Sequence, residues 1–217
     1  NIDQAVIIVA AKPTFSETFL NMCLVACEAA QIKPLIMFNK KDLPEFEVER
    51  KKIDYLEEIG YPVLPMSAKF DIEPLRHYLD GKTTLVLGPS GSGKSTLINR
   101  MVRGAQAQTR EISQALNAGK HTTTATSLYW VDRDLGTALI DSPGFQEFGL
   151  RHIDPMQLAA YMPDLKPHVA GCRFYNCTHL HEPSCGVLAA IDAEGGVHPR
   201  RHRIYADLFT ELSQSRY

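Results

Sequence analysis

The segment Gly88–Ser95, with the sequence GPSGSGKS, restricts the possible folds of this chain more than any other segment. It fits the pattern GxxxxGK(S/T), in which glycines let backbone N–H groups turn inward around phosphate oxygens. The pattern requires a strand before the loop and a helix after it, because the start of the helix adds a positive dipole. Thr83–Leu87 is a short apolar run and Lys94–Arg103 has helical character, so both requirements are met. A Gly-rich turn without a ligand is the alternative, and the flanking elements argue against it.

Strand-like and helix-like segments alternate along the first two thirds of the chain. Short apolar runs of the kind found in buried parallel strands are followed by stretches with helical spacing, and a hairpin is predicted over 127–141. This alternation predicts a doubly wound α/β sheet. It stops after Gly144, so we expect two domains, 1–150 and a small helical one at 151–217. The predicted strands and helices before the phosphate loop are Ala5–Ala11, Phe15–Gln31, Pro34–Phe38, Glu45–Ile59, Pro62–Met66 and Pro74–Leu79.

Composition excludes several classes of protein. With 217 residues, 44% hydrophobic and 22% charged, the chain falls among soluble globular proteins. The formal charge of −2 gives no chain-wide positive field for nucleic acid. No apolar run approaches the roughly 18 residues that span a bilayer, and no leader peptide opens the chain. We therefore expect a cytoplasmic protein without a membrane partner, with a monomer as the default.

Within the phosphate loop, two side chains have predicted chemical roles. Lys94 would reach the β and γ phosphates of a nucleotide, and the Ser95 hydroxyl would ligate Mg²⁺. The loop alone does not name the base of that nucleotide.

The segment Asn39-Lys-Lys-Asp42, which follows a predicted strand, can select a base. The Asp42 carboxylate would accept hydrogen bonds from the ring N–H and the exocyclic amine of guanine, a pair of donors that adenine lacks. Asn39 would connect neighbouring loops, and the stem of Lys40 would cover the base. NKxD alone is more typical of a solvated turn, and it gains weight from the other segments.

Two more segments follow predicted strands. Ser67-Ala-Lys69 ends the third, where the N–H of Ala68 could meet the guanine carbonyl oxygen, although the tripeptide alone is uninformative. Asp141-Ser-Pro-Gly144 matches DxxG, in which the aspartate holds Mg²⁺ through water and the glycine N–H contacts the γ-phosphate.

His121-Thr-Thr-Thr124 ends a long polar segment. A threonine hydroxyl there, assigned to Thr123, could complete the Mg²⁺ shell while γ-phosphate is present; a strand start is the equal alternative. Phe145 stands where a glutamine often orients the attacking water, so we expect slow intrinsic hydrolysis. His121 is the candidate for placing that water. The interpretation of His121 as a solvent-exposed loop histidine without a catalytic role has at least equal weight. We expect His121, Lys94 and Thr123 to take part in catalysis.

A cluster of three cysteines and a histidine lies near the C-terminus. The spacing Cys172-x₄-Cys177-x-His179-x₅-Cys185 gives three thiolates and an imidazole within 14 residues, a set suited to tetrahedral Zn²⁺. Four filled positions leave no site for water, so we expect a structural zinc. His181 could replace His179, and four buried residues without a metal are the alternative.

Two further groups have plainer interpretations. Cys23 and Cys27 lie four residues apart on a predicted apolar helix, where core packing is expected. The basic segment His198–Arg203 is either a contact to a phosphate backbone or a solvated helix start.

The order of these segments is rotated. In most GTP-binding proteins the phosphate loop precedes NKxD and SAK, whereas here the order is NKKD, SAK, GPSGSGKST, HTTT, DSPG. A circular permutation can keep such a site while moving the termini. With GKHTTT, DSPGF-x-EFGL and the cysteine spacing, the chain closely resembles the RsgA (YjeQ) family of circularly permuted GTPases that depend on the small ribosomal subunit.

The resemblance implies a GTPase that binds the small subunit and its rRNA late in assembly, hydrolyses GTP to GDP and phosphate on ribosomal stimulation, and then leaves. It places guanine selection on Asn39 and Asp42. Members of the family usually begin with an OB-fold that contacts RNA, whereas this chain begins on the first GTPase strand, so we expect that domain to precede it in the whole protein. The resemblance also assigns ligands for the phosphates and for zinc. The phosphates are placed on Gly88, Pro89, Ser90, Gly91, Ser92, Gly93, Lys94, Ser95 and Thr96, and zinc on Cys172, Cys177, His179 and Cys185.

Two other functions remain open at this point. An ATP-dependent phosphotransferase shares the phosphate loop, but NKKD argues against it. A nucleotide-gated RNA-binding module, in which hydrolysis is incidental, stays open because of Phe145.

Overall fold

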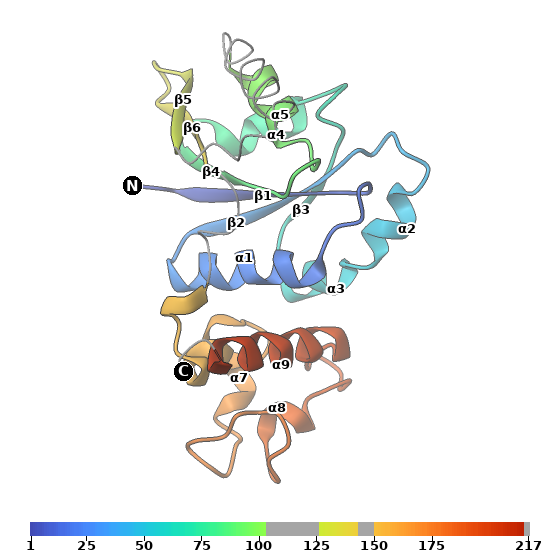
Figure 1. The fold of residues 1–217 in the computed structure, drawn as a ribbon, viewed down its shortest axis with the longest axis vertical. Helices are drawn as coiled ribbons and strands as arrows, with labels where there is room; N and C mark the ends of the chain where they lie inside the picture. Colours follow the sequence, from blue (N-terminus) through green and yellow to red (C-terminus); the bar gives the residue numbers. More distant parts are fainter. Residues whose placement is uncertain (103–125, 143–149, 215–217) are drawn as a thin grey trace. The chain divides into compact units, whose positions relative to one another are not determined.

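The computed structural model describes residues 1–102, 126–142 and 150–214. In this part of the chain the strands form one six-stranded sheet, with the order β3-β2-β1-β4-β6-β5 (Figure 1). Neighbouring strands pair in parallel except β5, which is antiparallel to β6. The predicted α/β class is confirmed. The strands are β1 (Gln4–Ala10), β2 (Lys33–Asn39), β3 (Val63–Pro65), β4 (Thr83–Leu87), β5 (Ser127–Asp132) and β6 (Thr137–Asp141).

The inner strands are apolar on both faces because both faces are covered. All seven residues of β1 are buried. On β2, Leu35 and Met37 join a core with α4 (Glu73–Leu79) and α5 (Lys94–Met101). Phe38, one residue further, points to the opposite face and makes an edge contact with Phe46, at 5.2 Å between ring centroids. Helices therefore cover the sheet on two sides.

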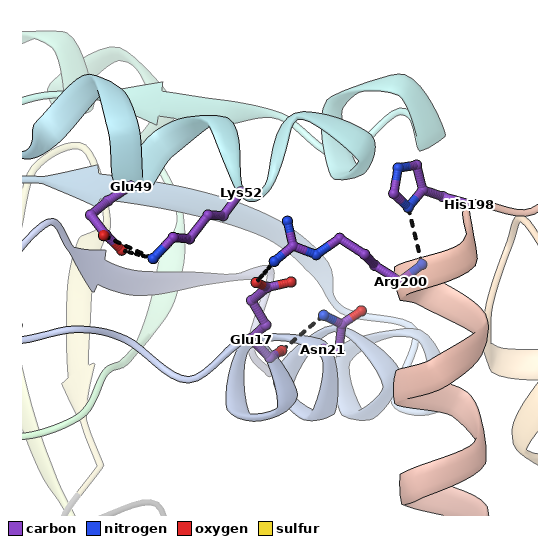
Figure 2. A network of polar contacts seen from close by, with 6 residues as sticks. All are labelled: Glu17, Asn21, Glu49, Lys52, His198 and Arg200. Carbon is purple, nitrogen blue, oxygen red and sulfur yellow. Dashed lines mark hydrogen bonds and ion pairs between the residues drawn. The ribbon is translucent and has the colours of Figure 1, made fainter.

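The amphipathic stretch predicted over Glu45–Ile59 divides into two short helices, α2 (Phe46–Lys51) and α3 (Asp54–Ile59). The apolar positions Phe46, Ile53 and Leu56 keep helical spacing across the break and are all buried, so periodicity does not reveal it. A partly buried ion pair joins the two helices' connection to α2, with Lys52 Nζ 2.7 Å from Oε2 of Glu49 (Figure 2).

Helix α1 (Glu17–Ala29) and the C-terminal segment form a second compact unit, whereas the sheet and its other helices form the first. Apolar side chains of α1, η3 and α9, among them Val25, Leu158 and Leu208, share one core. The division at residue 150 stays a prediction, and the contacts add α1 to the C-terminal unit. The other elements of this unit are η2 (Leu150–His152), η3 (Pro155–Tyr161), α7 (Lys166–Val169), α8 (Gly186–Ala189) and α9 (Pro199–Gln214).

A buried ion pair connects α9 to the rest of the second unit. Arg201 Nε donates to the two carboxylate oxygens of Asp164 at 3.1 and 3.3 Å, and Arg201 Nη1 donates to the Asn21 side chain on α1. The side chains of Arg201 and Asp164 are 0% and 5% exposed. Next to it, Arg200 donates to Glu17 at 2.7 Å (Figure 2). These contacts explain how a helix from the N-terminal part of the chain becomes part of the C-terminal unit.

None of the helices in the described ranges combines the length and the apolar character needed to cross a bilayer.

Candidate nucleotide and metal sites

The predicted nucleotide-binding segments lie where parallel strands end. Asn39 is the last residue of β2, Ser67 follows β3, Gly88 follows β4, and Asp141 is the last residue of β6. Because these four strands are parallel to β1 or to one another, their carboxyl ends lie at one edge of the sheet. This edge is where open α/β sheets bind ligands.

The phosphate loop is shaped by glycines that tolerate no side chain. Gly93 has a φ of +101°, a left-handed conformation, and a Cβ on it would lie 2.1 Å from Nδ2 of Asn39. A Cβ on Gly88 would lie 2.7 Å from Oγ of Ser92 and 3.0 Å from the carbonyl oxygen of Ile8. Backbone can approach backbone here only without side chains, as the sequence pattern predicted.

Asn39 connects the three loops of the site. It is 3% exposed, its Nδ2 donates to the carbonyl oxygen of Ser92 at 2.8 Å, and its Oδ1 accepts the N–H of Ala68 at 2.9 Å. The predicted connecting role of this amide is therefore visible in the geometry. The Ala68 N–H, which we expected to meet guanine, already donates to Asn39, so a contact with a base would have to share that hydrogen.

Lys40 and Asp42 have different surroundings. Nζ of Lys40 donates to the carbonyl oxygens of Gly91, at 2.8 Å, and Lys12, so its stem runs toward the phosphate loop. Asp42 is exposed and its Oδ1 accepts a hydrogen bond from the hydroxyl of Ser67. The carboxylate predicted to select guanine is thus oriented by the SAK segment and open to a ligand on its other side.

Lys94 forms an ion pair with the aspartate of the DSPG segment. Its Nζ lies 2.7 Å from Oδ1 of Asp141 and 2.8 Å from the carbonyl oxygen of Ser142. Ser95 and Thr96 are exposed in the first turn of α5. The cation predicted to meet phosphate and the anion predicted to meet Mg²⁺ therefore balance each other in this conformation. The predicted residues His121, Thr123 and Gly144 lie outside the described residues, as does Phe145.

The cysteine and histidine cluster has the dimensions of a tetrahedral metal site. Its four ligand atoms lie within 4.8 Å of one another. Sγ of Cys172 is 3.7 Å from Sγ of Cys185, and Nδ1 of His179 is 3.4 Å from each of these sulfurs. Tetrahedral Zn²⁺ with its usual bond lengths requires about 3.8 Å between sulfurs and about 3.6 Å between sulfur and nitrogen. The residues fit one metal ion, and His179 rather than the exposed His181 completes the set.

Burial and N–H groups set the charge of the cluster. Burial alone would raise the pKa of the Cys172 thiol, but hydrogen bonds from the backbone of Gly186 and Val187 and from the other thiols lower it. Burial raises the pKa of Cys177 to about 12 and lowers the pKa of His179, which keeps the imidazole neutral, as metal ligation requires. Metal binding must therefore displace protons from part of this cluster.

Polar side chains hold the histidine ligand from outside the cluster. The carboxylate of Glu182 accepts the Thr178 hydroxyl and the N–H groups of Thr178 and Leu180, at 2.8 and 3.2 Å, and of His181, at 3.3 Å. Burial alone would raise the pKa of Glu182, and these donors hold it well below its usual range. No short sequence pattern revealed Glu182, because its partners are backbone groups.

Helix α9 supports the same loop from a second direction. Nε2 of His202 lies 2.7 Å from the carbonyl oxygen of His179. The hydroxyl of Tyr205 donates to the carbonyl oxygen of Thr178 at 2.8 Å. His179 has a φ of +60°, which costs about 1 to 3 kcal/mol in a residue with a side chain, so these contacts stabilise a strained ligand.

The basic segment His198–Arg203 is only partly engaged inside the second unit. Arg201 is buried against Asp164, Arg200 pairs with Glu17, and His202 contacts the loop of His179. His198, Arg200 and Arg203 are exposed at the start of α9, so the contact to a phosphate backbone and the solvated helix start both stay predictions. Cys23 and Cys27 are buried in α1, as expected.

Known proteins share this arrangement. The sequence profile of the RsgA GTPases matches residues 1–151. The small ribosomal subunit biogenesis GTPase RsgA of Variovorax paradoxus is 57% identical, in an alignment that covers 100% of this chain and 71% of that protein. The chain belongs to the RsgA GTPase family. The RsgA of Paraburkholderia phytofirmans is 46% identical, with 99% of this chain and 70% of that protein covered.

Two solved structures of RsgA-type GTPases extend the likeness to the whole described fold. YjeQ from Thermotoga maritima matches with a TM-score of 0.75 and 32% identity, covering 98% of this chain and 72% of that one. YloQ, described as a circularly permuted GTPase, matches with a TM-score of 0.74 and 30% identity, covering 99% and 69%. The chain is therefore a GTP hydrolase with the rotated order of segments that its sequence shows.

Proposed function

We propose that this RsgA-family chain binds the small ribosomal subunit late in its assembly and hydrolyses GTP to GDP and phosphate when the subunit stimulates it. Hydrolysis would then release the protein. The observation that carries the proposal is the junction at Asn39, which joins the NKKD, SAK and phosphate-loop segments at one sheet edge. The names of its relatives support the ribosomal partner.

Guanine selection follows from the position of Asp42. Its carboxylate is exposed and oriented by Ser67, so it can accept two N–H groups of guanine, and adenine would leave it unpaired. The ammonium of Lys40, fixed to the carbonyl oxygen of Gly91, holds its stem alongside the predicted base position. Asn39 holds the NKKD, SAK and phosphate-loop segments in position through its two side-chain hydrogen bonds.

Phosphate binding would separate the pair of Lys94 and Asp141. In the bound state the ammonium would turn to the β and γ phosphates, and Asp141 would accept hydrogen bonds from water on Mg²⁺. Ser95 and Thr123 are the proposed Mg²⁺ ligands, and the N–H of Gly144 the proposed γ-phosphate contact. The magnesium ion would supply charge neutralisation at the phosphates.

The position of the attacking water is the least defined feature of the site in the absence of the ribosome. Phe145 has no group that can orient water, so we propose slow hydrolysis by the protein alone, with His121 placing the water when the ribosome is bound. Ribosomal contact would act by placing the attacking water. Its effect would then appear in the rate of hydrolysis more than in GTP affinity.

The metal centre has a structural role in this proposal. Three cysteines and His179 would hold one Zn²⁺ and leave no coordination position for a substrate. We propose that the ion keeps the loops around α8 folded so that the second unit presents a fixed surface. The protein would act in the cytoplasm, as a monomer, where ribosomal subunits assemble.

The chain itself connects nucleotide site and second unit. The sheet strand β6 ends at Asp141, and the chain continues from there into the second unit, while β1 ends at Ala10 and leads into α1 of that unit. We propose that a γ-phosphate-dependent shift near Asp141 moves the second unit. Energy transfer between labels on the two units would test this on the small subunit; equal efficiency with a GTP analogue and with GDP would contradict it.

GTP hydrolysis by the purified chain is the test of the proposed function. It is measured alone and with small subunits, large subunits or free RNA of matched phosphate content. Stimulation by small subunits that exceeds the effects of the other two supports the proposal. Stimulation by free RNA alone would favour an RNA-gated module, and retained GTP binding without any stimulation would contradict the ribosomal partner for these residues.

A further inference from the structure

The four residues between the first two metal ligands form an exposed aromatic loop. We name Arg173–Asn176 the aromatic knuckle. Tyr175 is fully exposed, with a relative exposure of 102%, and Phe174 is 41% exposed. The guanidinium carbon of Arg173 lies 5.5 Å from the centroid of the Phe174 ring. The knuckle thus places two exposed aromatic side chains and a cation on the surface of the second unit, and neither ring belongs to the buried core of that unit.

The knuckle is held by its surroundings rather than by its own side chains. Cys172 and Cys177, on either side of it, are both in the metal cluster. The N–H of Arg173 donates to the carbonyl oxygen of Ser184 at 3.1 Å, and that of Cys177 donates to Phe174 at 3.3 Å. A loop whose backbone is fixed at both ends loses little backbone entropy when its rings bind a ligand.

The chain segment that carries the knuckle has a positive net charge. The chain has no acidic residue from Leu165 to His181, whereas it has Lys166 and Arg173 there. The nearest acids in sequence are turned inward, since Asp164 pairs with Arg201 and Glu182 accepts backbone N–H groups. A polyanion can therefore approach the rings without meeting an exposed carboxylate of this segment.

Unpaired RNA matches these features better than a duplex does. Exposed bases stack on aromatic side chains and on arginine, and the phosphates beside them need nearby cations. A duplex buries its bases and offers no ring for Tyr175. We propose that the aromatic knuckle binds unpaired RNA bases, with Tyr175 and Phe174 as stacking platforms and Arg173 and Lys166 near the backbone; for ribosomal RNA this rests on the proposed function.

Binding of a short fluorescein-labelled oligoadenylate to the metal-loaded chain tests the proposal by fluorescence anisotropy. The double variant F174A/Y175A should raise the Kd for this strand about tenfold or more, because each stacked base contributes roughly a fivefold to hundredfold effect. The Kd for the same strand in a duplex should change less than about twofold. Tyr175→Phe should keep the binding and Tyr175→Leu should lose it, since only the first preserves an aromatic face.

Matched controls separate stacking from folding. Tyr78→Ala removes an aromatic side chain from α4 whose exposure, 40%, is close to the 41% of Phe174. This variant should leave RNA binding unchanged. Metal content, thermal unfolding and GTP affinity of the Tyr175→Phe and Tyr175→Leu variants should equal those of the parent. Equal Kd values for parent and Tyr175→Leu, an equal loss for single strand and duplex, or a parent that prefers the duplex would each overturn the proposal.

The same variants keep this proposal separate from the proposed function. Parent protein that binds oligoadenylate through the knuckle but is not stimulated by small subunits would contradict the ribosomal partner and leave the RNA site standing. A parent that is stimulated, together with a Tyr175→Leu variant that binds oligoadenylate equally well, would leave the function standing and overturn the RNA site.

Discussion

At the scale of single residues, the site depends on polar groups that are each held by a second group. Asn39 fixes Ser92 and Ala68, Ser67 orients Asp42, and Glu182 fixes the loop of His179. Substitution of such a supporting or supported group tests its contribution to the site.

Asp42→Asn should lower GTP affinity about a hundredfold or more, because an amide cannot accept both guanine donors. It should raise the affinity for xanthosine triphosphate, whose base offers an oxygen where guanine has its amine. Competition against a fluorescent GTP analogue measures both. Asp80→Asn, at an exposed position after α4, is the matched control and should behave like the parent. Loss of both affinities together would indicate damage to the loop rather than a change of specificity.

Glu182→Gln should weaken metal binding about tenfold to a hundredfold, the usual cost of losing a group that positions a ligand. A neutral amide accepts the three N–H groups less strongly, so the left-handed backbone of His179 loses support. Competition with a chromophoric chelator measures the affinity, and the absorption bands of the Co²⁺-loaded protein report the geometry. The exposed Glu194→Gln is the control. Parent-like affinity in Glu182→Gln would show that the loop is held without this carboxylate.

At the scale of elements, a buried ion pair adds to the apolar contacts that attach α9 to α1 and to the segment around η3. The pair of Arg201 and Asp164 has almost no contact with water. Asp164→Ala should reduce the free energy of unfolding of the second unit by about 3 to 5 kcal/mol, because it leaves a guanidinium buried without its carboxylate. Urea unfolding followed by circular dichroism measures this.

Two further variants serve as a control and as a test of the explanation. Asp207→Asn, on an exposed position of α9, should cost less than about 0.5 kcal/mol. The double variant D164L/R201M replaces the pair by apolar side chains and should recover much of the loss. If Asp164→Ala unfolds like the parent, solvent reaches Arg201 more easily than its burial indicates.

An element could be predicted from the sequence where the residues that determine it lie close together in the chain. The strands β1, β2 and β4 and the hairpin of β5 and β6 follow from apolar runs and turn residues, and their positions agree closely with the predicted ranges. The break between α2 and α3 was not predictable, because Phe46, Ile53 and Leu56 keep their spacing across it. The membership of α1 in the second unit was also hidden, since it depends on partners such as Arg201 about 180 residues away in the sequence.

The candidate sites show the same contrast. GPSGSGKS, NKKD and the cysteine spacing were visible because each lies within one short segment. The shared use of Asn39 by two loops and the support of His179 by His202 and Tyr205 needed three-dimensional contacts. The spacing of residues within a short segment reveals which of them can form a ligand set. Supporting groups such as His202 and Tyr205 come from other parts of the chain.

At the scale of the whole molecule, the apolar cores of the two units should respond separately when a stabilising group is lost from only one of them. In the described residues, one core of the first unit lies between the sheet and α4 with α5, and the core of the second unit joins α1, η3 and α9. Cys177 and Cys185 belong to the core of the second unit as well as to the metal cluster, so an ion bound there would contribute to the folding of that unit. The nucleotide segments lie on strands of the first unit.

Removal of the metal with a strong chelator should therefore destabilise one unit and spare the other. We expect the metal-free chain to lose its calorimetric transition for the second unit, or to show it at a lower temperature, while the affinity for GDP changes less than about threefold. Isothermal titration with GDP and a calorimetric scan of the same sample measure the two effects, and re-addition of Zn²⁺ should restore the transition. By the proposed coupling of the two units, stimulated hydrolysis should fall with the transition. A parallel loss of GDP affinity would show instead that the two units fold as one, because α1 begins only seven residues after β1 and would then carry the damage into the nucleotide site.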